Sequence, residues 1–81
     1  MKATVKVFAL VRQLAGQETL AVDLPPGATV ADLRRVIAEQ HPALADLVAH
    51  ALFAVNADYA SDATPIPARA DLACIPPVSG G

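Results

Sequence analysis

Apolar and polar residues alternate over residues 4–10, which is the pattern of a β-strand with one buried face. One face carries Val5, Val7 and Ala9, and the other carries Lys6, Phe8 and Leu10. Because the ammonium group of Lys6 favours water, we expect the face with Val5 to form the core and Phe8 to lie on the open face.

A second alternation covers residues 19–24 and predicts a second strand, antiparallel to the first. Its inward positions are Leu20, Val22 and Leu24, and Asp23 points outward. Pro25-Pro26-Gly27 ends this strand, because proline fixes φ and removes a backbone donor. Between the two strands we expect a short helical turn over residues 11–15, with Gly16 at its end.

The spacing becomes helical after Thr29. The apolar stripe consists of Val30, Leu33, Val36 and Ile37. Thr29 offers a side-chain oxygen for the N-cap, and Asp32 suits the positive end of the helix dipole. Pro42 disfavours helical geometry at the residue before it, so this main helix should end near His41.

The second half of the chain contains shorter apolar segments. Residues 43–51 have helical spacing over a short length, which leaves their structure open, whereas residues 52–56 and 72–75 predict strands. Two prolines flank Ile66 and restrict that segment to an edge or a brief pairing. The order of elements indicates an α+β fold, in which residues 1–75 form a mixed sheet packed on one main helix.

Length and charge limit the classes of partner. The 81 residues make one small domain, and six lysines and arginines stand against eight aspartates and glutamates. The basic residues form no cluster beyond Arg34 and Arg35, which we assign to the solvated face of the main helix. This argues against nucleic acids and anionic membranes as partners. With no signal-peptide pattern and no long apolar run, we expect a cytoplasmic protein.

Three residues are candidates for redox or metal chemistry. The single cysteine, Cys74, cannot form an internal disulfide, and its inward strand position favours a small buried hydrophobe over a sulfur-relay thiol. His41 and His50 lack a cysteine partner and the spacing of a metal site, so we expect no bound metal ion.

The tail, residues 76–81, has a different character from the rest of the chain. Pro76 and Pro77 resist helix formation and should hold the tail extended, away from the domain. Gly80 and Gly81 carry no side chain, so the terminal carboxylate can enter a channel as narrow as the backbone. Six extended residues reach about 20 Å. That length is enough to place the carboxylate in the active site of a partner.

Several motifs resemble the small subunit of molybdopterin synthase, also called molybdopterin converting factor subunit 1, a family of ubiquitin-like sulfur carriers. They are the tail Pro76-Pro77-Val78-Ser79-Gly80-Gly81, Phe8-Ala9-Leu10-Val11-Arg12, Ala28-Thr29-Val30-Ala31-Asp32-Leu33 and Ala54-Val55-Asn56. The resemblance implies a β-grasp domain over residues 1–75 and a reactive tail over residues 76–81. Two places depart from the family pattern: Cys74-Ile75 replaces an aromatic pair, and Arg69-Ala70-Asp71 replaces an acidic turn.

The same resemblance implies chemistry at Gly81. A ubiquitin-activating-type adenylyltransferase would use ATP and magnesium to adenylate the Gly81 carboxylate, and sulfur delivery would give a thiocarboxylate. The tail would then enter the large subunit of molybdopterin synthase and donate sulfur to cyclic pyranopterin monophosphate, in an assembly of two carriers and two large subunits. The threading segment would be Pro76, Pro77, Val78, Ser79 and Gly80. The carrier itself would bind no cofactor and would supply no general base.

A docking surface should lie beside the point where the tail begins. Ile75 is on the outward face of the last strand and therefore shares the open face with Phe8. Tyr59, in a turn region, completes an exposed apolar cluster of the kind that forms interface hot spots. We expect Phe8, Tyr59, Ile75 and Val78 to dock both partners, with Arg12 in contact with an acidic group of a partner.

Three other functions stay open on the sequence. A carrier for thiamine thiazole or cysteine synthesis would use the same terminal chemistry, although thiamine-pathway carriers are usually shorter and lack the Pro-Pro-Val-Ser approach. A ubiquitin-like modifier would instead join its terminus to lysines of other proteins. The third alternative is a β-grasp interaction module whose tail is inert.

Overall fold

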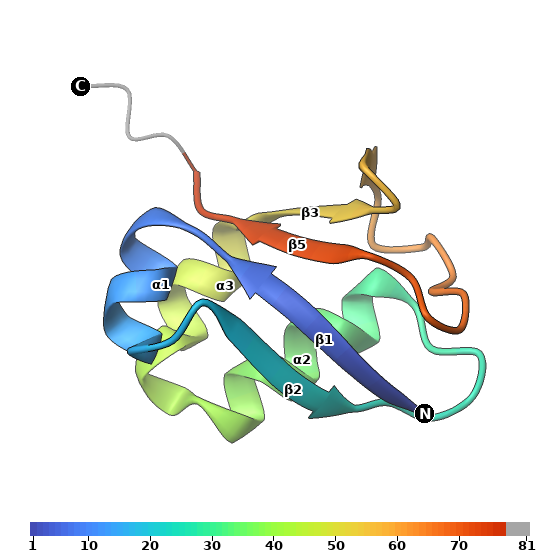
Figure 1. Cartoon of the computed structure of the whole chain (residues 1–81), viewed down its shortest axis with the longest axis horizontal. Coiled ribbons are helices and arrows are strands. Elements are labelled where there is room, and N and C mark those ends of the chain that lie inside the picture. Colours follow the sequence, from blue (N-terminus) through green and yellow to red (C-terminus); the bar gives the residue numbers. More distant parts are fainter. Residues whose placement is uncertain (78–81) are drawn as a thin grey trace.

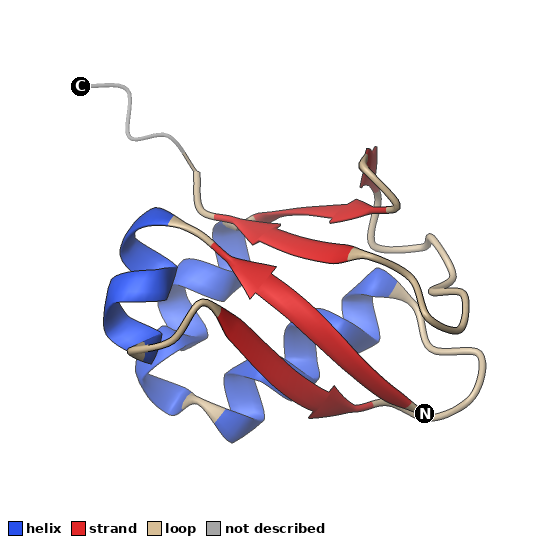
Figure 2. Cartoon of the chain, viewed as in Figure 1, coloured by secondary structure: helices blue, strands red, loops and turns tan. Residues whose placement is uncertain are grey.

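Within residues 1–77, five strands form one mixed sheet, and the helices pack against one of its faces (Figure 1, Figure 2). The computed structural model describes residues 1–77. Its elements are β1 (Lys2–Val7), α1 (Ala9–Ala15), β2 (Thr19–Asp23), α2 (Val30–Gln40), the 3₁₀ helix η1 (Pro42–Leu44), α3 (Ala45–His50), β3 (Leu52–Val55), β4 (Asp58–Ala60) and β5 (Leu72–Ile75). The strand order is β2-β1-β5-β3-β4, with β1 and β5 parallel and the other pairs antiparallel. The predicted α+β class with a mixed sheet is confirmed.

The first strand ends earlier than the alternation predicts. Val5 and Val7 are buried as expected, but β1 stops at Val7. The prediction that Ala9 faces the core from a strand is wrong, because Ala9 is exposed and begins α1 with a φ of 51°. Leu10, predicted in the same strand, also lies in α1. The early turn into a helix brings Val11 into the core, where it is fully buried.

The rest of the first hairpin follows the prediction. Gly16 ends α1 in the left-handed conformation, with a φ of 71°, and its N–H donates to the carbonyl of Arg12 at 3.0 Å. β1 and β2 are antiparallel, and Leu20 is buried and pairs with Val5 across the two strands. Leu24 lies just beyond β2, is buried, and donates its N–H to the Met1 carbonyl at 2.8 Å.

The main helix begins with a reciprocal capping box. The N–H of Asp32 donates to Thr29 Oγ1 at 3.4 Å, and the N–H of Thr29 donates to Asp32 Oδ2 at 2.9 Å. This backbone hydrogen bond from Thr29 is the main cause that lowers the pKa of Asp32. The helix ends at Gln40 with His41 as its C-cap, as Pro42 predicts.

The assignment of Arg34 to the solvated face of this helix is wrong. Only 23 % of its side chain is exposed. Its Nη1 donates to the carbonyls of Val48 at 2.7 Å and Ala51 at 2.8 Å. The Val48 carbonyl also accepts from the N–H of Ala51 at 3.3 Å. The last carbonyls of a helix need donors from outside it, and Arg34 of α2 adds a charged one at the end of α3. Arg35 does stay exposed, in ion pairs with its helix neighbours.

The second half of the chain contains more regular structure than its sequence predicts. The sequence left residues 43–51 open, and all but Ala51 of them are helical, in η1 and α3. Asn56 and Ala57 form a tight turn, with φ values of 51° and 71°, that leads into the unpredicted strand β4. Ile66 is buried, and the neighbouring Pro65 forms a single bridge with Thr29, which is the brief pairing expected there.

Candidate functional site

The tail begins at the end of β5, between two neighbouring strands. β5 pairs with β1 on one side, where Cys74 is level with Val7, and with β3 on the other, where Ile75 is level with Leu52. The chain leaves the sheet beside the connection from β1 to α1 (Figure 1). Because β5 is held on both edges, the root of the tail, residues 75–77, has a firmly anchored start. The predicted residues Val78, Ser79, Gly80 and Gly81 lie outside the described residues.

Phe8 and Ile75 lie near each other beside this root, as the sequence predicts. Phe8 is 43 % exposed and Ile75 is half-buried, and both line one groove. Leu52 adds a large apolar side chain on the same face as Ile75, since the two residues are directly opposite in the antiparallel pair. Leu52 is 54 % exposed, and the sequence reasoning missed it. Alternation with the buried Phe53 was the signal that would have placed it outward.

Tyr59 lies on the same open face but at a distance from the tail root. It is opposite Ala54 in the pairing of β4 with β3, and Ala54 is opposite Ala73 of β5. Two strand spacings of about 4.8 Å therefore place Tyr59 about 10 Å across the sheet from β5. A shallow hollow of about 260 Å³ connects Phe8 with Ala54 and Ala73. Tyr59 shares the surface with Phe8 without lining the groove at the tail root.

An apolar groove of about 580 Å³ lies at the tail root. It is lined by residues 8–10, Leu47 and residues 75–77. None of these side chains carries a charge. The groove combines the start of α1, a residue of α3 and the first residues of the tail, so no single stretch of sequence predicts it.

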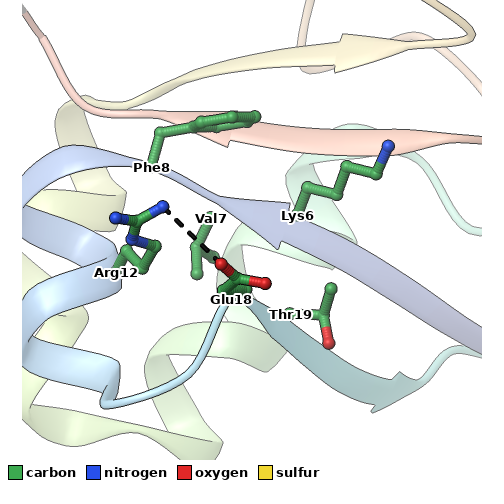
Figure 3. Close-up of a pocket in the computed structure, with 6 residues that line it drawn as sticks. All are labelled: Lys6, Val7, Phe8, Arg12, Glu18 and Thr19. Carbon is green, nitrogen blue, oxygen red and sulfur yellow. Dashed lines mark ion pairs between the residues drawn. The ribbon is translucent and has the colours of Figure 1, made fainter.

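A second hollow, of about 240 Å³, lies on another side of Phe8 (Figure 3), and we call it the polar hollow because charged and polar side chains form most of its lining. It is lined by Lys6, Val7, Phe8, Arg12, Glu18 and Thr19. The guanidinium of Arg12 is directed toward Glu18, with 3.9 Å between Nη1 and Oε1 (Figure 3). Both side chains are largely exposed, and such a pair contributes little to stability and is free to exchange partners. Arg12 is thus next to Phe8, as a docking role requires.

Cys74 is placed as a core residue. Its side chain is fully buried opposite Phe53 in the sheet, and desolvation raises the pKa of the thiol to about 11. A thiol with so little thiolate at neutral pH is a poor relay for sulfur. The placement agrees with the buried-hydrophobe interpretation.

The described residues form neither a metal-binding cluster nor a membrane-spanning helix. Within residues 1–77, no group of three His, Cys, Asp or Glu side chains is arranged to hold a metal ion. The ring of His50 instead contacts the carbonyl of Asp46 at 3.1 Å. None of the helices in the same range is long and apolar enough to cross a membrane. The arrangement can present a tail and bind the surface of another protein.

Comparison with known proteins gives a consistent result. The sequence model of the ThiS family matches residues 5–81. The molybdopterin synthase sulfur carrier subunit of Chlamydomonas reinhardtii is 35 % identical over 83 residues that cover all of both chains. The protein of the same name from Arabidopsis thaliana is 32 % identical over 95 % of this chain and 80 % of its own length.

Solved structures share the fold. SAMP1, a small archaeal modifier protein of Haloferax volcanii, superposes over all of both chains with a TM-score of 0.85 and 31 % identity. A putative molybdopterin converting factor subunit 1 of Pyrococcus furiosus gives a TM-score of 0.82 and 34 % identity, over 96 % of this chain and 99 % of its own. A Helicobacter pylori protein, solved as a complex of subunits 1 and 2 of molybdopterin-converting factor, has a TM-score of 0.68 over the whole of both chains, and its 21 % identity shows the fold alone. The predicted ubiquitin-like β-grasp fold is confirmed.

Proposed function

This chain belongs to the ThiS family, and from that membership we propose that it is the sulfur-carrier small subunit of a molybdopterin synthase. The observation that carries the proposal is the extent of the similarity. The family match runs through the tail to residue 81, and the relatives called molybdopterin synthase sulfur carrier subunit match nearly the whole chain. The structure adds a tail root anchored between β1 and β3, beside an exposed apolar surface.

The proposed chemistry takes place at the terminal carboxylate of Gly81. A carboxylate is a poor electrophile, so an activating enzyme first uses it to attack the α-phosphorus of ATP, and magnesium pyrophosphate leaves. Hydrosulfide sulfur then attacks the carbonyl carbon of the acyl-adenylate, AMP leaves, and loss of a proton gives the thiocarboxylate. ATP and magnesium belong to the activating enzyme in this scheme.

Sulfur transfer follows in the large subunit of the synthase. The thiocarboxylate sulfur displaces an oxygen substituent from a carbon of cyclic pyranopterin monophosphate: the carbon–sulfur bond forms, the carbon–oxygen bond breaks, and the oxygen leaves with its electron pair and takes up a proton. Water then cleaves the bond between that sulfur and the acyl carbon, which restores the Gly81 carboxylate for another cycle. We propose that residues 76–80 thread this reactive end into both partners, and that the reaction takes place in the cytoplasm.

We propose that the surface formed by Phe8, Leu52, Ile75 and Tyr59 docks these partners, with Arg12 at its polar edge. The Helicobacter pylori neighbour, whose fold is similar, was solved together with subunit 2 of its own converting factor. Phe8, Leu52 and Tyr59 are exposed in the free protein and share the open face with the half-buried Ile75. Exposed aromatic and aliphatic side chains of this kind are typical of interface hot spots.

The intact mass of the chain tests the proposal. The full chain is incubated with ATP, magnesium, sulfide and the ubiquitin-activating-type enzyme of the same source. We expect a mass gain equal to the replacement of one oxygen by sulfur, located at Gly81 by fragmentation. A variant that lacks Gly80 and Gly81 should show no gain. An activating enzyme that loads a control carrier but leaves this chain unchanged would contradict the proposal.

A second candidate function is protein modification. The similarity to SAMP1, which carries the name of a modifier, favours it. In that case a lysine amine of another protein would attack the Gly81 carbonyl of the acyl-adenylate, AMP would leave, and loss of a proton would give an isopeptide bond. An affinity-tagged form of the chain can be expressed in the organism from which it comes. Many proteins should then carry it, joined through its C-terminal glycine to their lysines. Recovery of the thiocarboxylate with no such adducts would support the carrier function.

A further inference from the structure

We propose that the apolar groove at the tail root receives an apolar projection of the protein that accepts the tail, and that carboxylates beside this projection pair with Lys6 and Arg12. The inference rests on the proposed function, because it requires a partner that takes up residues 76–81. It goes beyond the open face of the sheet, since the groove extends around Phe8 to the side that carries α1 and α3.

The groove has the character of a binding site for apolar side chains. Its lining is formed by aromatic, aliphatic and proline side chains, and its volume of about 580 Å³ lies within the usual range for ligand sites. Leu10 is 48 % exposed there, although burial of apolar surface is favourable by about 25 cal/mol per Å². An occupant that covers Leu10 and Leu47 would gain this free energy.

The tail itself forms one wall of the groove. Pro76 and Pro77 line it together with Phe8 and Leu10. Any group that fills the groove therefore contacts the first residues of the tail. Because proline has a fixed φ, this contact acts on a segment with few accessible backbone conformations. A partner that occupies the groove would therefore also contact Pro76 and Pro77.

The positive charges of Lys6 and Arg12 beside the groove indicate that the occupant carries carboxylates. Phe8 separates the apolar groove from the polar hollow that contains Lys6 and Arg12. Among the described carboxylates, none forms an ion pair with Lys6, and the pair of Arg12 with Glu18 is long and exposed. The hollow therefore presents two cations to one weakly held anion, on a chain whose formal net charge is −2. An apolar projection flanked by carboxylates complements both parts.

The chain offers a matched pair of leucines for the test. Leu10 and Leu14 are on the same helix, one turn apart, and are 48 % and 53 % exposed. Leu10 lines the groove, whereas Leu14 does not. Alanine is a strong helix former, so Leu10→Ala and Leu14→Ala should both fold like the wild type. The two variants lose the same atoms and differ only in whether those atoms contact the groove.

The affinity of each full-length chain for the large subunit of molybdopterin synthase is measured by titration calorimetry. We expect Leu10→Ala to weaken binding by about tenfold or more and Leu14→Ala by less than about twofold. If the wild-type chain binds and the two variants have equal affinities, the groove is not a docking site, and the proposed function is unaffected. If the wild-type chain does not bind the large subunit, the proposed function fails and the groove fails with it.

A second matched pair tests the carboxylates. Lys2 and Lys6 are both on β1 and both exposed, but only Lys6 lines the polar hollow. At low salt, Lys6→Gln should slow association with the large subunit by at least about threefold, and Lys2→Gln should have a smaller effect, because steering depends on charges near the interface. The difference should shrink as salt is added. Equal rates for the two variants at low salt overturn the proposed pairing of Lys6.

Discussion

The guanidinium of Arg34 lies over the ring of Phe53, with 4.9 Å between Cζ and the ring centroid. The same guanidinium donates to the carbonyls of Val48 and Ala51, and its Nη2 is 2.8 Å from Asp62 Oδ1. One side chain on α2 therefore holds the end of α3, the start of β3 and the loop after β4. These contacts fix the strand that carries Leu52 beside β5.

Arg34→Ala should lower the free energy of unfolding by about 2 kcal/mol, because two carbonyls lose a charged donor and the ring of Phe53 loses its cation. Chemical denaturation followed by circular dichroism measures the change. Arg35→Ala is the control, since Arg35 makes only exposed ion pairs and its loss should cost less than about 0.5 kcal/mol. Equal losses for the two variants would contradict the structural role of Arg34.

Cys74 should resist alkylation in the folded protein. Burial raises the pKa of its thiol to about 11 from 9.0, which reduces the thiolate fraction at pH 8 about 100-fold. Iodoacetamide at pH 8 should therefore leave the native chain unmodified and react readily in denaturant, as mass spectrometry can show. Rapid labelling of the native chain would contradict the buried position.

The raised pKa of the Cys74 thiol also predicts that the protein loses stability at alkaline pH. The folded pKa lies above the unfolded value, so the unfolded thiol releases its proton first as the pH rises. Stability is thus complete below about pH 9 and falls as the pH increases toward about 11. Cys74→Ala should remove this part of the dependence, which denaturation midpoints measured at several pH values would reveal.

The turn between β3 and β4 is strained at Ala57. Its φ of 71° belongs to the left-handed region, which costs an L-residue about 1 kcal/mol relative to glycine. Ala57→Gly should therefore raise the free energy of unfolding by up to about 1 kcal/mol and convert the turn to the favoured Asn-Gly form. The control is Ala21→Gly in β2, which should destabilise the protein. A loss of stability in both variants would contradict the left-handed turn.

Local patterns predicted much of this fold, and long-range contacts account for most of what they missed. The alternation in β1 and β2 and the N-cap at Thr29 are encoded by neighbouring residues, and the structure contains them. The end of β1 was misplaced because alternation continues through Leu10, whereas the chain enters α1 at Ala9 and buries Val11. The role of Arg34 depends on carbonyls at least fourteen residues away, which helical periodicity cannot reveal.

The candidate site divides in the same way. Alternation predicted that Phe8 and Ile75 share a surface, and both line the groove, although Phe8 lies just beyond β1, at the N-cap of α1. The groove depends on α3, which places Leu47 at the tail root. No local sequence pattern indicates this long-range contact. Tyr59 was grouped with Phe8 through its chemistry, and only the strand order shows how far across the sheet it lies.

Gly80→Ala should impair sulfur transfer while the domain folds normally. A methyl group at this position would widen the tail and restrict its backbone, in a segment proposed to pass through a narrow channel. We expect at least about a tenfold lower rate of product formation with the large subunit and an unchanged denaturation midpoint. Ser79→Ala is the control, because it adds no bulk to the tail. Unchanged sulfur transfer by Gly80→Ala would contradict the threading role.

Phe8→Ala should weaken binding to both the activating enzyme and the large subunit. The ring is exposed in the free domain and lines both the apolar groove and the polar hollow, so a partner at either one contacts it. Loss of a central aromatic anchor costs about 2 kcal/mol or more, which corresponds to an affinity about 30-fold lower. Tyr59→Ala removes a ring on the same face about 10 Å from β5 and should cost less. Calorimetric titrations of both variants against each partner measure the difference. If Tyr59→Ala proves more costly than Phe8→Ala, the centre of the interface lies toward β4, and the tail root is its rim.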